Sequence, residues 1–249
     1  MNPWFVHPDF NAIIRTGKAD NTMEESAVLF SLRLSLQVAS VATIFIVVIG
    51  VFLGYLLAGR NFRGRELLDV LITLPLVLPP TVTGYYLIVL FGRNGIIGGR
   101  IYAWTGWSIM FTWYAAALAS FIVALPLMIK TSRAAIESVD GNLINASYTL
   151  GYSELQTVFR IILPLSKKGL LAGTVLSFAR AIGEFGATLM LSGNIPGKTD
   201  TMPLAIYSAA NSGEWSKAHL MVGLLTLFSG TLLYLANKFG GGKHGTIIS

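Results

Sequence analysis

The segment VASVATIFIVVIGVFLGYLLA, residues 38–58, carries no charged side chain. A helix of about 20 mainly apolar residues is long enough to cross the ~30 Å hydrocarbon core of a bilayer. Together with the residues before it, the segment predicts a membrane-spanning helix over residues 29–58. This first span decides the fold class, because an uncharged run of this length and hydropathy is typical of a membrane protein.

Four further apolar segments follow, over residues 67–91, 107–129, 169–191 and 218–236. Of the 249 residues, 53% are hydrophobic and 12% are charged, whereas about a quarter of a soluble domain is charged. The sequence therefore predicts an all-α integral membrane protein with about five transmembrane helices. We expect a single membrane domain over residues 28–238, with an extracytoplasmic extension, 1–27, before it and a cytoplasmic tail, 239–249, after it.

The distribution of Lys and Arg predicts the orientation in the cell membrane. The loops after the first and third spans and the C-terminal tail carry twice as many basic as acidic side chains, whereas the opposite side is balanced. Because cytoplasmic loops are enriched in Lys and Arg, we expect the C-terminus and the long loop 130–168 in the cytoplasm and the N-terminus outside. This topology and contact with anionic lipids explain the net charge of +6, which therefore does not indicate nucleic-acid binding.

The long loop contains the sequence GNLINASYTLGYSELQTVFRIILP, residues 141–164. Gly151 predicts the end of a first short helix, because glycine accepts the left-handed conformation common at helix ends. A second, amphipathic helix follows, and we expect Pro164 to break it before the fourth span. The loop therefore predicts two short helices at an angle, a shape suited to docking on a soluble partner, although a loop that only packs on its own bundle is the alternative.

The same segment resembles the EAA loop of binding-protein-dependent ABC importer permeases, written E-A-A-x3-G-x9-I-x-L-P. Here the pattern is Asn145-Ala146-Ser147, three residues, Gly151, nine residues, and then Ile161, Leu163 and Pro164. The spacing is kept, while Asn145 and Ser147 depart from the first box. The resemblance implies a type I permease fold, a coupling helix seated on an ABC ATPase present in two copies, a homodimer of this chain, and an extracytoplasmic oxyanion-binding protein.

The chain contains no GxxxxGK[ST] sequence, so the resemblance implies that ATP and Mg are used by the separate ATPase. We therefore expect a transport subunit without catalytic residues, metal or cofactor of its own. A membrane-embedded enzyme would need clustered His, Asp or Glu within the bilayer, and only Arg180 and Glu184 lie there. A scaffold subunit is the other remote alternative.

Three stretches resemble the molybdate branch of these permeases: SLRLSLQVAS at 31–40, LPLVLPPTVTGYYL at 74–87, and FARAIGEFGATLMLSGNIPGKTDTMPLAIY at 178–207. Related sulfate permeases share the GEFGA core. The resemblance implies molybdate as the translocated anion, with tungstate and sulfate as alternatives. The apolar part of the third stretch, MPLAIYSAA, is too short to cross the membrane, and it is expected to be either a re-entrant element or a surface loop.

Two places within the spans are candidates for the translocation path. Prolines at 75, 79 and 80 predict a break in the second span near Thr81 and Thr83, whose hydroxyls either line a path or satisfy freed carbonyls. In the fourth span Arg180 and Glu184 lie one turn apart on one face, deep in the membrane. They either border the path or form a structural ion pair, while the nearby Gly186 allows close helix approach.

Overall fold

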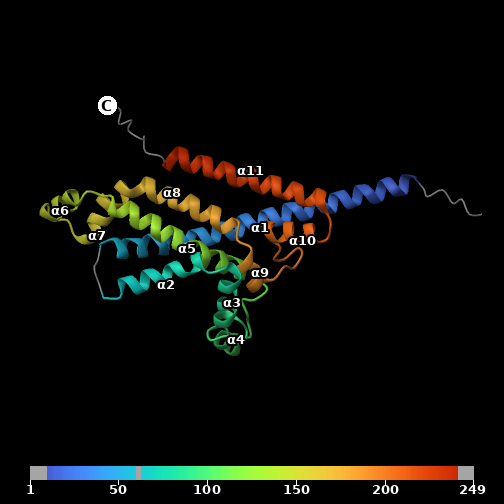
Figure 1. Cartoon of the computed structure of the whole chain (residues 1–249), viewed down its shortest axis with the longest axis horizontal. Helices are drawn as coiled ribbons and strands as arrows, with labels where there is room; N and C mark the ends of the chain where they lie inside the picture. The colour runs from blue at the N-terminus through green and yellow to red at the C-terminus, as the bar shows by residue number, and fades with distance from the viewer. Residues whose placement is uncertain (1–9, 60–62, 241–249) are drawn as a thin grey trace, which may run out of the picture.

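The computed structural model describes residues 10–59 and 63–240, and within them the chain is helical without strands (Figure 1). The predicted all-α membrane fold is confirmed. The helices are α1 (Phe10–Gly59), α2 (Arg65–Val77), α3 (Pro80–Phe91), α4 (Gly98–Thr105), α5 (Trp113–Glu137), α6 (Gly141–Thr149), α7 (Glu154–Thr157), a π-helical turn (Val158–Ile162), α8 (Leu163–Ile182), α9 (Gly186–Ser192), α10 (Met202–Asn211) and α11 (Trp215–Gly240).

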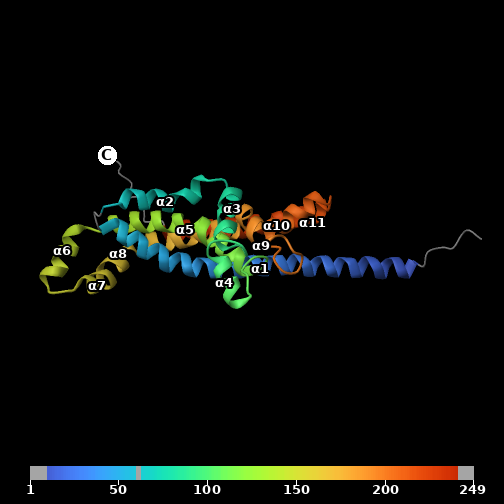
Figure 2. The same cartoon turned by 90° about the horizontal axis from the view of Figure 1, so that it is seen from below.

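Helix α5 lies at the centre, with α1 and α8 packed along it (Figures 1 and 2). Small residues permit this close approach: a Cβ at Gly54 of α1 would lie 2.7 Å from Ser132 Cβ of α5. Alanines on the three helices join Ile46, Met128 and Ile182 in one buried cluster. A second cluster joins α5 to α3 and α9. The core of the described protein is therefore built around the third predicted span.

Four helices are long and apolar enough to cross a membrane, or five if the bent pair α2–α3 counts as one span. The break that the prolines predict in the second span is present, because the helix axis bends by 117° between α2 and α3. The two helices are separated by Leu78 and Pro79, and Pro80 begins α3. As a result α3 and α4 project sideways from the bundle instead of continuing along α2 (Figures 1 and 2).

Several span boundaries differ from those read from hydropathy. The third span begins at Trp113, not at 107, and continues to Glu137. The fourth begins at Glu154 and ends at Ile182, where a break separates it from α9. The predicted long loop is therefore mostly helix, because charged residues at a helix end lower its hydropathy without ending the helix. Of the N-terminal extension, residues 10–27 belong to α1, and residues 1–9 lie outside the described part, as do 241–249 of the tail.

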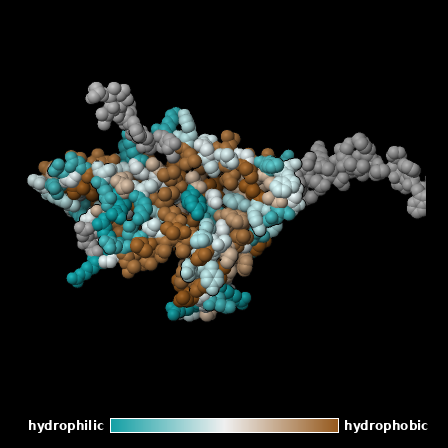
Figure 3. Space-filling model, viewed as in Figure 1, coloured by the Kyte–Doolittle hydropathy of each residue, from teal (hydrophilic) through white to brown (hydrophobic). Residues whose placement is uncertain are grey.

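The surface has the layered polarity of a membrane protein. In Figure 3 hydrophobic residues cover the middle of the visible face, and hydrophilic residues gather at the end that carries α6 and α7 and at the tip of the α3–α4 projection. At the opposite end of the bundle α10 packs against α1 and α11 through Met202 and Ala205. The segment MPLAIYSAA thus forms a short, half-buried helix against the spans.

Candidate functional site

The loop between α5 and α8 forms a projecting pair of short helices, α6 and α7, at one end of the molecule (Figure 1). Asp140 begins α6 by accepting a hydrogen bond from the Asn142 N–H at 2.9 Å. Gly151 follows α6 with a φ of +81°, and Ser153 and Gln156 form a reciprocal capping box at the start of α7. The left-handed turn at Gly151 is what sets the two helices at an angle.

Ser147, the third residue of the EAA-like box, fixes α6 to α7. Its Oγ lies 2.8 Å from Thr157 Oγ1, and both side chains are buried. The rest of α6 is open: Asn145 and Ala146 are exposed, and so are Leu143, Tyr148 and the adjoining Leu150. A fixed knob with exposed apolar side chains at its tip is suited to insertion into a groove on another protein.

Pro164 does not break the chain before the fourth span, contrary to the prediction. The helix continues from Glu154 to Ile182 because proline is tolerated in the first turn of α8. The preceding π turn supplies the adjustment, since the Leu163 N–H donates to the Val158 carbonyl five residues back. Ile161 and Leu163, the other residues of this box, are half-buried. The loop is thereby joined rigidly to the fourth span.

The two broken spans meet each other inside the bundle. A Cβ at Gly186 would lie 2.8 Å from Pro80 Cβ, and a Cβ at Gly84 would lie 3.0 Å from the Ala187 Cα. The start of α3 therefore packs directly on the start of α9, with only glycine fitting at the contact. Irregular backbone at membrane depth is tolerated where it is buried in protein or lines a cavity.

The hydroxyls near this junction are not used to satisfy broken backbone. Thr83 is buried, and its Oγ1 has no hydrogen-bond partner among the described residues, while Thr81 is exposed. Ser177 of α8 and Thr188 of α9 also have buried hydroxyls without a partner in the described part of the chain. The sequence did not single out these last two, because nothing in the pattern says which Ser and Thr hydroxyls are buried without a partner.

Arg180 and Glu184 form an ion pair at the end of α8, with Nη1 and Oε2 2.8 Å apart. The Glu184 side chain is almost fully buried, at 1% exposed, whereas one third of Arg180 is exposed. The second Glu184 oxygen accepts the Ala187 N–H at 2.9 Å. Glu184 thus joins the last turn of α8 to the first turn of α9, across the break.

Residues 34–239 match the family described as binding-protein-dependent transport system inner membrane component. The chain belongs to this family. Its permease fold agrees with the membrane subunits of solved importers. A structure titled as the inward-facing MetNI methionine ABC transporter has a TM-score of 0.69 at 17% identity, covering 87% of this chain and 95% of the other. A bacterial alginate ABC importer has a TM-score of 0.68 at 13% identity, covering 85% and 78%. The chain is thus a type I ABC importer permease of the inner membrane.

The permease is similar to several curated relatives over most of its length. The molybdenum transport system permease protein ModB of Escherichia coli K12 is 45% identical over 202 residues, covering 80% of this chain and 88% of the relative. That of Haemophilus influenzae is 48% identical, covering 75% and 80%. The sulfate transport system permease protein CysT of Salmonella typhimurium is 33% identical, covering 86% and 78%. These relatives are permease subunits, not enzymes, and the family implies a separate ATPase and a substrate-binding protein.

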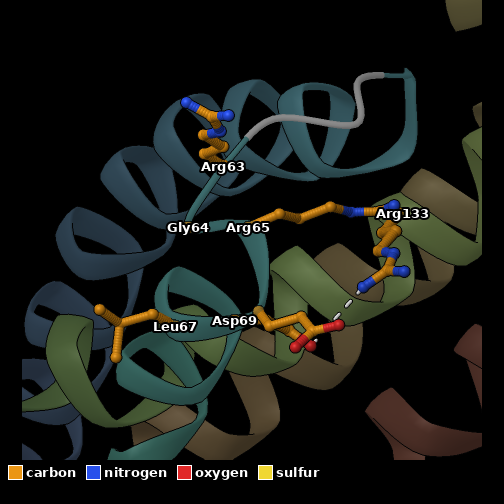
Figure 4. Close-up of a pocket in the computed structure, with 7 residues that line it drawn as sticks. Arg63, Gly64, Arg65, Leu67, Asp69 and Arg133 are labelled. Carbon is orange, nitrogen blue, oxygen red and sulfur yellow. Dashed lines mark ion pairs between the residues drawn. The ribbon is translucent and has the colours of Figure 1, made fainter.

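An ion-pair network ties α2 of the permease to α5 at the end that carries α6 (Figure 4). Asp69 accepts Lys130 Nζ at 2.7 Å and lies 3.6 Å from Arg133, which also pairs with Glu137 at 2.8 Å. Arg65 lies 3.6 Å from the same Glu137. The network borders a cavity of about 750 Å³. Each exposed pair contributes about 0–1 kcal/mol, so the network chiefly fixes the direction in which α2 leaves its loop.

At the opposite end of the permease the loop between α9 and α10 is bound to α1. Asp200 accepts the Gly197 N–H at 3.0 Å and the Ser31 hydroxyl at 3.3 Å. The Met202 N–H donates to Ser35 Oγ at 2.7 Å. Burial raises the pKa of the Asp200 carboxyl above its ordinary value, although these hydrogen bonds and the charge of Lys217 oppose the shift.

The raised pKa of Asp200 gives a pH dependence with a definite sign. Because the folded loop binds this proton more tightly than the unfolded chain does, the stabilisation by protonation is complete below the unfolded pKa and is lost as pH rises through the folded pKa. We expect the wild type to gain thermal stability relative to Asp200→Asn as pH falls from neutral towards the ordinary carboxyl pKa of 3.8. The measurement is the unfolding midpoint of both proteins in detergent across that range. A constant difference at all pH values would contradict the assignment.

Proposed function

We propose that this permease subunit carries molybdate inward across the plasma membrane, driven by a separate ATPase. The observation that carries the substrate is the identity of 45–48% to relatives named as molybdenum permeases, over three quarters or more of this chain. The sulfate relative is 33% identical, so sulfate is the weaker candidate, while tungstate has nearly the size and charge of molybdate and is the closer alternative.

We infer that α6 and α7, together with the π turn and the first residues of α8, are the coupling element. The residues concerned are Asn145, Ala146, Ser147, Gly151, Ile161, Leu163 and Pro164. Three features support this role: the exposed apolar tip, the internal Ser147–Thr157 contact, and the continuous helix from Glu154 to Ile182. A knob fixed in this way transmits a movement of the ATPase to the fourth span as a rigid body, because packed elements move as units.

We place the translocation path beside the junction of the two broken spans. Thr81, Thr83 and Gly186 belong to that junction, and the buried Thr83 hydroxyl has no hydrogen-bond partner among the described residues. To Arg180 and Glu184 we assign the fixing of the α8–α9 break, which sets the shape of the path. An anion held tightly by a free arginine would leave slowly, whereas a paired Arg180 attracts it weakly.

The working assembly in this proposal is a homodimer of the permease around one path, alternating between inward-open and outward-open states. Two ATPase copies, which use ATP and Mg, dock on the coupling elements in the cytoplasm. An oxyanion-binding protein delivers molybdate from outside. The N-terminus lies outside and the C-terminus in the cytoplasm, in keeping with the Lys and Arg of the loops around α6.

Uptake into proteoliposomes tests the proposal. The permease is reconstituted with its ATPase, and the binding protein is added outside with molybdate. We expect molybdate uptake that requires hydrolysable ATP, that tungstate suppresses, and that a large excess of sulfate leaves nearly unchanged. Equal suppression by sulfate would overturn the molybdate assignment, and uptake without ATP hydrolysis would overturn the importer mechanism.

A further inference from the structure

An open apolar groove runs between α1 and α8, outside the junction of the broken spans. It has a volume of about 670 Å³, within the range of about 300–1,000 Å³ of small-molecule sites. Val48 and Phe52 of α1, Phe159 of the π turn and Leu171 of α8 line it and are each more than half exposed. The groove is therefore open towards the surroundings of the bundle.

The length of the groove fits part of a lipid acyl chain. Along α1 it extends from Val47 to Tyr55, about 12 Å at 1.5 Å per residue. One leaflet contributes about 15 Å of the hydrocarbon core. On α1 the lining residues Val47 to Tyr55 lie within the predicted first span, and on α8 Leu170, Leu171 and Thr174 lie within the predicted fourth span, so this part of the groove lies at the depth of the acyl chains. The part that Leu155, Val158, Phe159 and Leu163 line is on the expected cytoplasmic side of Lys167.

The polar groups of the groove do not compete with an apolar occupant. The Thr174 hydroxyl donates to the Leu170 carbonyl at 2.8 Å, and the Tyr55 hydroxyl donates to Glu154 at 3.0 Å. The remaining polar lining residue is Lys167, which lies between Leu163 and Leu170 in the middle of the lining along α8. It is exposed and forms no ion pair within the described part of the chain.

From this arrangement we propose that the groove binds an anionic phospholipid, with the phosphate at Lys167 and an acyl chain in the part of the groove between Lys167 and Thr174, against α1. The cation stands at the expected cytoplasmic surface, where anionic lipids concentrate and basic residues attract their headgroups. This inference is independent of which anion the permease transports.

The test uses the permease purified with its ATPase and titrated with phosphatidylglycerol or phosphatidylcholine, counting bound lipids by native mass spectrometry. Lys167→Gln is compared with Lys168→Gln, an exposed neighbour that does not line the groove. We expect Lys167→Gln to lower phosphatidylglycerol binding about five-fold, the factor for one cation at an anionic surface, with Lys167→Arg retaining it. Lys168→Gln should change it less than two-fold. Equal losses in the two glutamine variants would overturn the site.

Filling the groove gives a second, independent readout. Leu171→Trp places a larger side chain in the groove, while Leu165→Trp is a matched control, because Leu165 is similarly exposed on α8 but lies outside the lining. We expect Leu171→Trp to reduce the binding of both lipids and Leu165→Trp to leave it unchanged. Unchanged lipid binding would overturn the proposal, as would separation of the permease copies by Leu171→Trp without loss of lipid, which would show that a second copy occupies the groove.

Discussion

Gly151→Val is expected to uncouple the permease from its ATPase. The residue has a φ of +81°, and a β-branched side chain is strongly disfavoured in that region. The left-handed conformation costs on the order of 1–2 kcal/mol for an ordinary residue, equivalent to a factor of about 5–30 in population. We expect ATP-driven uptake in proteoliposomes to fall by about that factor, because α6 is no longer held at the angle that presents its tip.

The control for this prediction is Gly141→Ala at the start of the same helix. That position has an ordinary φ, and a Cβ there would meet open space. Uptake should remain within about two-fold of the wild type. If Gly151→Val retains full uptake and full stimulation of ATP hydrolysis, the angle between α6 and α7 has no part in coupling.

Of the substitutions proposed for this permease, Glu184→Ala is expected to cause the largest loss of folding stability. Removing one partner of a buried ion pair costs about 3–5 kcal/mol, and the lower value applies because Arg180 is one third exposed. The Ala187 N–H also loses its acceptor. For a protein of this size about 3 kcal/mol lowers the unfolding midpoint by about 6–12 °C, measured for the purified permease in detergent.

The double variant Arg180→Gln with Glu184→Gln distinguishes two roles of Arg180: one partner of a structural ion pair, or a cation that contacts the transported anion. Two amides can keep the contact without burying a charge, so we expect most of the lost stability and most of the uptake to return. A stable double variant that transports no molybdate would contradict the structural assignment and place Arg180 in contact with the anion.

The amino-acid sequence was sufficient for the parts of the fold that depend on composition and local chemistry. Uncharged runs located the spans, Pro79 and Pro80 located the break in the second, and Gly151 located the turn between α6 and α7. Each of these follows from one residue type acting on its own backbone. The ends of the spans were less accurate, because hydropathy falls near Lys130 while the helix continues to Glu137.

Other features depend on contacts between distant segments and could not be predicted. The break after Ile182 has no proline; it depends on Glu184 capping α9 and on Gly186 packing against Pro80. Pro164 was expected to end a helix, and the sequence pattern did not predict the π turn over Val158–Ile162 that precedes it. The hydrogen bond from Ser31 to Asp200 joins residues 169 positions apart, and no local sequence pattern predicts it.

Photo-crosslinking from the tip of the coupling element tests the central claim most directly. A benzoylphenylalanine is placed at Leu150, 76% exposed beside α6, or at Trp104, 92% exposed in α4. The purified permease–ATPase complex is irradiated, and adducts are identified by mass. We expect an ATPase adduct from position 150 and none from position 104. No ATPase adduct from position 150, or an equal yield from position 104, would contradict docking of the ATPase on α6 and α7.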